Sequence, residues 1–317
     1  MASLKRKAKS PRSTAKSAPK STAKSTSGRQ SLRLHRFAGV AMGGGKSEKT
    51  SLAIIEYYPA EKRLFLRALR DRVADEDRLE PRRDDERGKR RVSHDQVLFE
   101  LLTKGEKGLE IIAFDAPLQL PKCIRCTLPC PGYERCELPA IRWHWEMFRA
   151  RQAVKRPTKI FTPYTERCAE VWISQELEEE FHPSHALGAN AAPLAARLHY
   201  LARRLRAVKS KSKPELIEVF PKLSVWRIGS QLKLPKSQLR FHRHGQESDT
   251  ARHQFLKALV ESEQAFIYQQ DVKLMVENPQ VFDAFIAAYT AFLKHLGRTQ
   301  PRPQGYPKDE IWIEFPA

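Results

Sequence analysis

The sequence predicts an α/β domain in which a mixed sheet is flanked by helices. Two observations lead to this class. Short runs rich in β-branched and aromatic residues, such as LAIIEYY at residues 52–58, are typical of buried strands. Stretches with apolar residues three or four positions apart, such as VFDAFIAAYTAFL at 281–293, are typical of helices that pack on a sheet. With 317 residues, of which 41% are hydrophobic, the chain is long enough to bury a sizeable core.

The predicted elements follow one another as three strands, a helix and a fourth strand. The strands are expected at residues 37–41, 52–58, 64–69 and 109–114, and Ser93 is expected to cap a helix that ends near Gly105. The glycines at 43–45, followed by Lys46 and Ser47, resemble a phosphate-binding loop. However, such a loop needs a glycine where Val40 stands and a helix after it, so we predict a hairpin turn.

The chain carries a formal charge of +20, and part of this charge lies in a separate N-terminal segment. Residues 1–31 hold nine Lys and Arg, no acid and no aromatic residue, so they cannot bury enough apolar surface to fold. We therefore expect a disordered basic tail over residues 1–34 and one domain over residues 35–317. The basic charge indicates nucleic acid, either DNA or RNA, as the partner. A purely solubilising tail is equally compatible with this composition.

No apolar run is long enough to span a bilayer, and the first residues do not read as a signal peptide. We therefore expect a cytoplasmic protein without a membrane contact. The mixed-charge run from Asp71 to Arg91 is expected to form a solvated loop.

Four of the five cysteines lie within 14 residues, in the pattern C-x2-C-x3-C-x5-C. They are Cys123, Cys126, Cys130 and Cys136. Stable disulfides are rare in the cytosol, so metal ligation is favoured, and four thiolates suit either Zn²⁺ or an iron–sulfur cluster. We expect residues 122–137 to form an inserted cysteine-rich, metal-binding loop. Cys168 lies on a predicted helix and is expected to be a small core residue.

Three carboxylates stand in unusually apolar surroundings. Asp115 follows directly after a fully apolar strand, Glu218 lies inside the strand LIEVF, and Asp283 lies in the apolar helix at 281–293. A buried charge needs a cation or a polar partner. Mg²⁺ and Mn²⁺ prefer oxygen ligands, and a pair of such ions catalyses phosphodiester hydrolysis in many nucleases. For Glu218, an ion pair with Lys222 or Arg227 is the alternative.

The order of these motifs resembles the predicted RNase H-like nucleases of domain of unknown function family 429. The matching features extend over roughly residues 36–316: the opening hairpins, IIAFDAPLQLP, FTPYTER, LGANAAPLAARLHYL, LIEVFPKLSVWRIG and VFDAFIAAYTAFL. The resemblance implies an RNase H-like mixed sheet and a divalent-metal-dependent nuclease. It also implies that Asp115, Glu218 and Asp283 form the family's acidic site, with Mg or Mn as the cofactor.

One departure from the family pattern concerns the end of the first strand. RNase H-like enzymes usually carry an Asp there, but this chain has Ala41, and only the more distant Glu48 offers a carboxylate nearby. The alternative function is therefore a catalytically inactive RNase H-like protein that binds nucleic acid and keeps a structural Zn or Fe–S site. A third, weaker alternative is a nucleotide-binding protein, because kinase-like relatives of this fold contact phosphates with the first hairpin.

Overall fold

The computed structural model describes residues 34–44, 50–73, 93–153, 162–177, 182–183, 186–188, 191–209, 213–262 and 264–317. Three expectations therefore lie outside the described residues. The first is the disordered tail, of which only Leu34 is described, and the second is most of the charged run from Asp71 to Arg91. The third is the carboxylate of Glu48 near the end of the first strand.

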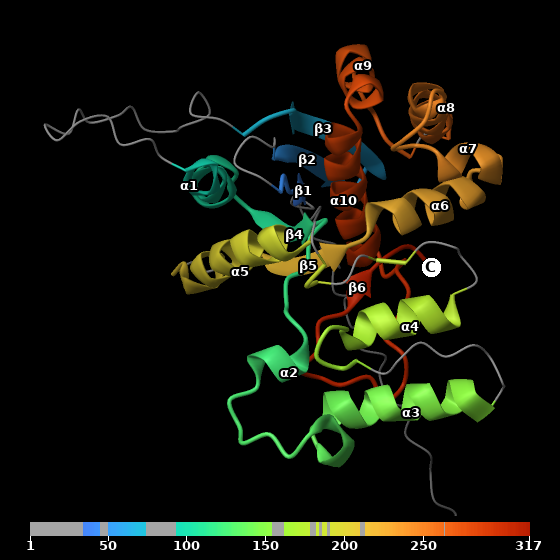
Figure 1. Ribbon diagram of the computed structural model, residues 1–317. Coiled ribbons are helices and arrows are strands. Elements are labelled where there is room, and N and C mark those ends of the chain that lie inside the picture. The colour runs from blue at the N-terminus through green and yellow to red at the C-terminus, as the bar shows by residue number, and fades with distance from the viewer. Residues whose placement is uncertain are drawn as a thin grey trace, which may run out of the picture. The chain divides into compact units, whose positions relative to one another are not determined.

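A six-stranded mixed sheet forms the centre of the domain (Figure 1), in the order β3-β2-β1-β4-β5-β6. The strands are β1 (His35–Ala41), β2 (Ser51–Tyr58), β3 (Arg63–Arg70), β4 (Leu109–Phe114), β5 (Glu215–Val219) and β6 (Ile313–Glu314). The first three strands pair antiparallel, whereas β4 runs parallel to β1, β5 to β4 and β6 to β5. The first five strands were predicted from the sequence, and β6 was not.

Helices cover both faces of this sheet (Figure 1), which makes the domain an α/β fold. The helices are α1 (His94–Glu100), α2 (Lys122–Arg125), α3 (Pro139–Ala153), α4 (Cys168–Glu176), α5 (Ala192–Ala207), α6 (Pro221–Gln231), α7 (Lys236–Arg240), α8 (Ser248–Glu261), α9 (Gln269–Glu277) and α10 (Pro279–His295). Ser93 caps α1 as predicted, and its side chain accepts a hydrogen bond from the Gln96 amide. The last turn, Leu101–Gly105, continues α1 as a π-helix.

The two faces of the sheet bury separate cores, because side chains alternate along each strand. On the first face, Phe37 and Ala41 of β1 pack with α10, α6 and α8. On the second face, Ala38 and Val40 pack with α1 and α5. A third core joins α3 and α4 to the C-terminal segment that contains Trp312 and Phe315. None of the helices in the described part of the chain has the length and apolar character to cross a membrane.

Gly39 sets the distance between β1 and α10. A Cβ atom at this position would lie 2.1 Å from the Ala284 carbonyl oxygen and 2.2 Å from the Ala288 amide nitrogen, both in the backbone of α10. Backbone atoms cannot move aside as the end of a side chain can, so only glycine permits this contact. The close approach holds the middle of α10 against β1.

We expect Gly39→Ala to lower the free energy of unfolding by about 2–3 kcal/mol, because the extra methyl group overpacks a rigid contact. Urea unfolding measures this loss. Gly108→Ala is the control: Gly108 has φ +79° and nothing within 4 Å of an added Cβ. The free energy of unfolding of Gly108→Ala should fall by only about 1 kcal/mol, because alanine is less stable than glycine in the left-handed conformation. Equal losses in the two variants would contradict the packing argument.

Candidate active site at the carboxyl ends of the parallel strands

Asp115 lies where the carboxyl ends of β1 and β4 meet. It follows the last residue of β4, and its backbone amide donates a hydrogen bond of 3.1 Å to the Val40 carbonyl oxygen. The Met42 amide in turn donates a hydrogen bond of 2.7 Å to Oδ1 of Asp115. These two bonds fix the carboxylate beside the end of β1, at the sheet edge where α/β proteins commonly bind ligands.

Asp283 approaches the same edge from α10. It is fully buried in the second turn of the helix, and both of its carboxylate oxygens lack a hydrogen bond within the described residues. Gln280, one turn earlier, donates a hydrogen bond of 3.3 Å to the carbonyl oxygen of Ala41. The first turn of α10 is thereby joined to the end of β1. A buried carboxylate without hydrogen bonds needs a positive charge nearby, and Arg243 supplies one to Asp283.

Two residues of the segment after α7 face Asp283. Nε2 of His242 lies 3.7 Å from Oδ1 of Asp283, and Nε of Arg243 lies 3.1 Å from Oδ2. His242 is buried, its Nδ1 lies 3.2 Å from the Leu239 carbonyl oxygen, and its Nε2 has no hydrogen bond within the described residues. If Nδ1 carries the proton for Leu239, the lone pair of Nε2 is directed toward Asp283.

The environment of Asp115 also favours binding of a cation. Burial raises the pKa of Asp115 to about 7, and the nearby charge of Asp283 adds to this increase. The Met42 amide and the Arg243 guanidinium act in the opposite direction and lower the pKa. A buried carboxyl group whose pKa is raised by burial and by a second carboxylate is typical of functional sites, because a bound cation relieves the repulsion between the two negative charges.

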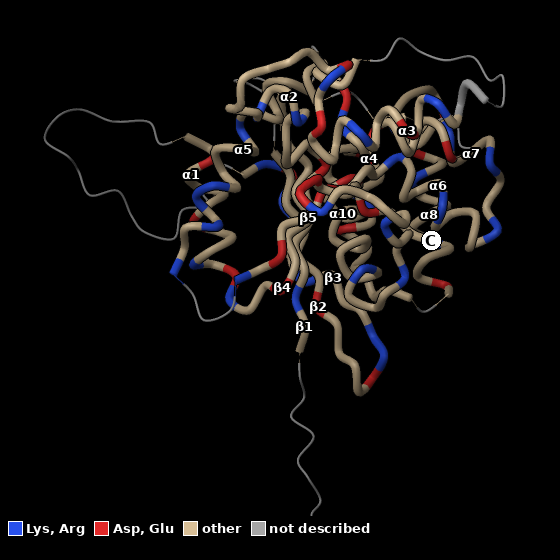
Figure 2. The backbone as a smooth tube through the Cα atoms, turned by 90° about the horizontal axis from the view of Figure 1, so that it is seen from below, with Lys and Arg blue, Asp and Glu red and all other residues tan. Residues whose placement is uncertain are grey.

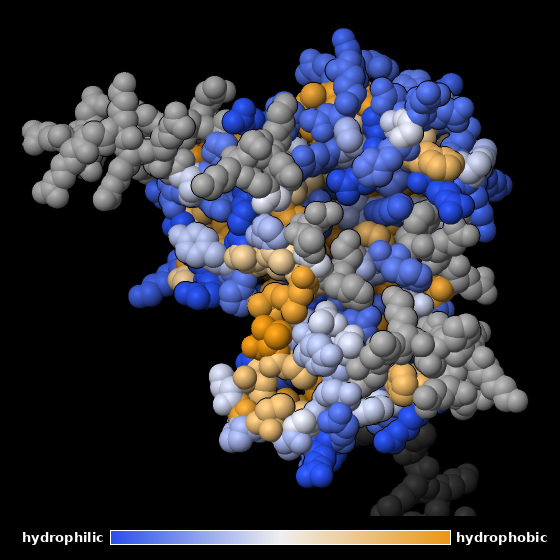
Figure 3. Space-filling model, viewed as in Figure 1, coloured by the Kyte–Doolittle hydropathy of each residue, from blue (hydrophilic) through white to orange (hydrophobic). Residues whose placement is uncertain are grey.

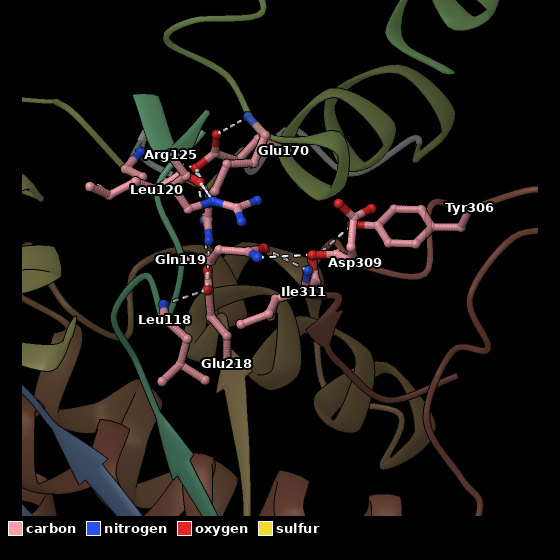
Figure 4. A network of polar contacts seen from close by, with 11 residues as sticks. Leu118, Gln119, Leu120, Arg125, Glu170, Glu218, Tyr306, Asp309 and Ile311 are labelled. Carbon is pink, nitrogen blue, oxygen red and sulfur yellow. Dashed lines mark hydrogen bonds and ion pairs between the residues drawn. The ribbon is translucent and has the colours of Figure 1, made fainter. Parts of the chain in front are cut away.

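Glu218 has different surroundings, although it lies on the neighbouring strand. Arg167 binds both of its carboxylate oxygens, at 2.7 Å each, and both side chains of this pair are buried. The Leu118 amide donates a further hydrogen bond of 2.9 Å (Figure 4). Arg167 also binds Glu170, at 2.8 Å. Glu218 therefore has the ion pair that its sequence context suggested, but the partner that the structure gives it is Arg167.

Strand alternation explains why Glu218 is separate from the two aspartates. Ile217 and Val219 pack into the core on the α10 face, so Glu218 between them points to the opposite face. Along β4, Ala113 also faces α10, so Asp115 two residues later shares this face. Of the three predicted ligands, the structure brings together Asp115 and Asp283 and places Glu218 elsewhere.

Ala41 occupies the position at which a third carboxylate would be expected. Val40 of β1 pairs with Phe114 of β4, so Ala41 and Asp115 are neighbours across the two strands. Ala41 is fully buried and belongs to the core on the α10 face. An acid at position 41 would therefore share the face of Asp115 and Asp283. The described part of the site holds two carboxylates, together with His242 and Arg243.

Basic residues surround this edge of the sheet. Burial lowers the pKa of Lys222 in the first turn of α6, and the charges of Arg243 and Arg240 lower it further. The three side chains are thus close enough to form one positive region. Figure 2 shows Lys and Arg along the chain at α6 and α7. A positive region next to buried carboxylates is suited to a phosphodiester substrate.

The cysteine-rich segment forms a module attached to α3 and to the C-terminal segment. Arg125 binds the buried Glu310, and Lys122 binds Asp309. Gln119 adds hydrogen bonds to Asp309 and Ile311 (Figure 4). Tyr133 stacks on Trp145 of α3, with ring centroids 6.1 Å apart. Outside the module, Cys168 is a buried residue at the start of α4, as predicted, and its thiol faces the Ala140 carbonyl oxygen at 3.7 Å.

The four cysteines of the module form no disulfide bond and lie near one another. Burial raises the pKa of Cys123, and the charges of Cys136, Cys130 and Cys126 raise it further. In the described part of the chain, however, no three of these sulfur atoms lie within 4.8 Å of one another. Hydrophobic side chains gather at the surface in this region (Figure 3), where Ile124 and Leu128 are 51% and 63% exposed.

Fold and site together define an α/β protein with a buried carboxylate pair at the carboxyl ends of its parallel strands. The chain belongs to the family described as "Protein of unknown function (DUF429)", which it matches over residues 85–307. Comparison with curated proteins and with solved structures gave no match.

His242 and Arg243 are site residues that were not predicted from the sequence. In the sequence they belong to Phe241-His242-Arg243-His244, which indicates only a basic loop. Their place beside Asp283 depends on the buried Arg252, whose guanidinium donates to the carbonyl oxygens of His242 and Val276. The signal available in the sequence was Arg252 itself, a charged residue on the apolar face of α8.

Proposed function

We propose that this protein hydrolyses phosphodiester bonds in nucleic acid, with Mg²⁺ or Mn²⁺ held by Asp115 and Asp283. The observation that carries the proposal is the pair of acids Asp115 and Asp283 at the same sheet edge, where the buried Asp283 has an ion pair with Arg243 but no hydrogen bond within the described residues. Oxygen donors of this kind fit a hard divalent cation. The bound ion supplies electrostatic stabilisation of a phosphodiester and activation of water.

The protein's own groups would bind and orient the substrate. Arg243, with Lys222 nearby, is placed to receive a phosphate group next to the carboxylates. The fold supports the same proposal: three antiparallel strands are followed by strands that run parallel to the first, as the RNase H-like resemblance implies.

A second candidate function is nucleic-acid binding without hydrolysis. It is favoured by the replacement of the expected first-strand Asp with Ala41 and by the ion pair that neutralises Glu218. Two carboxylates hold a pair of divalent ions less well than three or four do, because less of the ions' positive charge is balanced. Both functions require nucleic acid as the partner.

One experiment separates the two functions. Labelled single- and double-stranded DNA and RNA are incubated with the full chain in Mg²⁺ or Mn²⁺, and binding is measured on the same samples by gel shift. Cleavage that Asp283→Asn removes, with binding retained, supports the hydrolase. Binding without cleavage supports the second function, and the absence of both rejects the two together. Cleavage that survives Asp283→Asn places the activity outside this site.

The four cysteines of the module are proposed to hold Zn²⁺ or an iron–sulfur cluster. Their proximity supports this, as does the short, proline-containing segment that carries them. A tetrahedral site would require the sulfur atoms to move closer together than they are in this structure.

We expect Cys126→Ser to lower the bound zinc or iron by the content of one site per chain, because three thiolates hold either metal more weakly than four. Elemental analysis of protein purified without oxygen measures this loss, and visible absorption distinguishes an iron–sulfur cluster from colourless zinc. Cys168→Ser is the matched control and should leave the metal content unchanged. An equal metal content in Cys126→Ser and the parent chain would contradict the proposal.

A further inference from the structure

A second group of possible metal ligands lies at the other end of β1 from Asp115. It consists of His35, the first residue of β1, Glu110 in β4, and His295, the last residue of α10. One ligand atom from each lies within 4.8 Å of the other two. Since β1 has seven residues, about 20 Å of strand separates this group from the carboxylate pair.

The distances in this group match those between ligands of one metal ion. Nδ1 of His35 lies 2.7 Å from Oε1 of Glu110, and Nδ1 of His295 lies 3.5 Å from Oε2. Two ligands bound tetrahedrally at about 2.0–2.1 Å from Zn²⁺ are about 3.3 Å apart. The observed distances bracket this value, and a bound ion would replace the hydrogen bond between His35 and Glu110.

The donor set indicates which class of metal would bind. Two imidazole nitrogens and one carboxylate oxygen are typical of Zn²⁺ sites with one position open to solvent. Mg²⁺ and Ca²⁺ prefer oxygen ligands alone, so this group would discriminate against the ions proposed for Asp115 and Asp283.

The surroundings hold both imidazole rings in place and favour a cation. The His35 and His295 ring centroids are 4.4 Å apart, and the His295 ring lies 5.2 Å from that of Phe37. His295 ends a helix of 17 residues, whose C-terminal partial charge attracts a cation. The three side chains are 11%, 34% and 26% exposed, in chain order, so an ion can enter from solvent.

We propose that His35, Glu110 and His295 form a zinc-binding site that joins the starts of β1 and β4 to the end of α10. The site is independent of the proposed hydrolase site and of the cysteines. A bound ion would hold the C-terminal end of α10 on the sheet, as the contact at Gly39 holds its middle, and would stabilise the fold by mass action.

The test compares the zinc bound per chain by the full-length protein and by three variants, His35→Asn, Glu110→Gln and His295→Asn, after equilibration with Zn²⁺ and dialysis. Each variant is expected to bind one zinc ion fewer and to lose the part of the zinc-dependent rise in melting temperature that belongs to this site. Glu277→Gln is the matched control, because it removes a carboxylate that is 59% exposed at the end of α9 and should leave this zinc ion in place.

Cobalt distinguishes this site from the cysteines. Thiolate ligands give Co²⁺ strong near-ultraviolet charge-transfer absorption, whereas imidazole and carboxylate ligands do not. The variants should keep that absorption and lose only one weakly absorbing ion. Glu110→Gln preserves size and shape, so it decides the outcome even if His35→Asn disturbs the strand. An unchanged zinc count in Glu110→Gln and His295→Asn would overturn the proposal.

Discussion

Arg167→Met is expected to lower the free energy of unfolding by about 3–5 kcal/mol, because it removes the one side chain that the structure shows bound to two buried carboxylates. Glu218 and Glu170 are 4% and 3% exposed. Burial opposes the charge of Arg167, but Glu218 and Glu170 outweigh this effect and raise its pKa. Methionine fills a similar volume without carrying a charge, so the two acids would face each other uncompensated.

Urea unfolding at neutral pH measures this effect. Arg167→Lys is the control for geometry: it keeps the charge but cannot bind both oxygens of Glu218 as the planar guanidinium does, so a smaller loss is expected. In the Arg167→Met background, Glu218→Gln should restore part of the stability. A loss below about 1 kcal/mol in Arg167→Met would show that water or another cation already compensates the two acids.

The same ion pair shows where prediction from the sequence ended. Glu218 lies within the apolar strand LIEVF, so the sequence predicts that its charge has a partner. The partner could not be identified, because Arg167 lies 51 positions earlier in the chain and reaches Glu218 only through the packing of α4. The alternation of Ile217, Glu218 and Val219 does predict that Glu218 faces away from its neighbours. Asp283 lies on the face of the sheet that α10 covers. The alternation of residues along the strands does not predict which face this is.

The sheet itself was largely predictable. The strands β1 to β5 are apolar runs bounded by turn residues, and these local signals persist in the fold. Strand β6 has only two residues, Ile313 and Glu314, and it is a strand only because β5 lies beside it. The residues of the site also divide into those with a local sequence signal and those that depend on tertiary contacts. Asp115 and Asp283 were recognisable as acids in apolar surroundings, whereas His242 depends on tertiary contacts made by Arg252.

Asp115→Asn is expected to abolish hydrolysis and yet to stabilise the metal-free protein at pH 8. The ordinary pKa of this carboxyl group is 3.8, and burial, together with Asp283, raises it to about 7 in the folded chain. The folded state therefore binds a proton more tightly than the unfolded state does. The stability that Asp115 contributes is fully present below about pH 4 and is lost as the pH rises through 7. Asparagine does not ionise, and its Oδ1 can still accept the hydrogen bond from Met42.

Urea unfolding in a chelator at pH 5 and pH 8 measures this difference. At pH 8 the variant should exceed the parent chain by about 1–2 kcal/mol, which is less than the full pKa shift implies because Asp115 is only half-buried. At pH 5, which lies between the two pKa values, the difference should be less than half of that at pH 8. Asp309→Asn is the control, because its free energy of unfolding at pH 8 should change in the opposite direction. Its hydrogen bond to Lys122 lowers the pKa of Asp309, so the variant should lose stability at pH 8.

Adding Mn²⁺ then separates a metal site from a merely strained carboxylate. If Asp115 and Asp283 hold the ion, Mn²⁺ raises the stability of the parent chain and leaves Asp115→Asn almost unchanged, so the order of the two reverses. Hydrolysis should fall at least about 100-fold in the same variant. An Asp115→Asn variant that is less stable than the parent chain at pH 8 without metal would show that the carboxylate is structural. The stability cost of Asp115 would then no longer support a role in binding a cation.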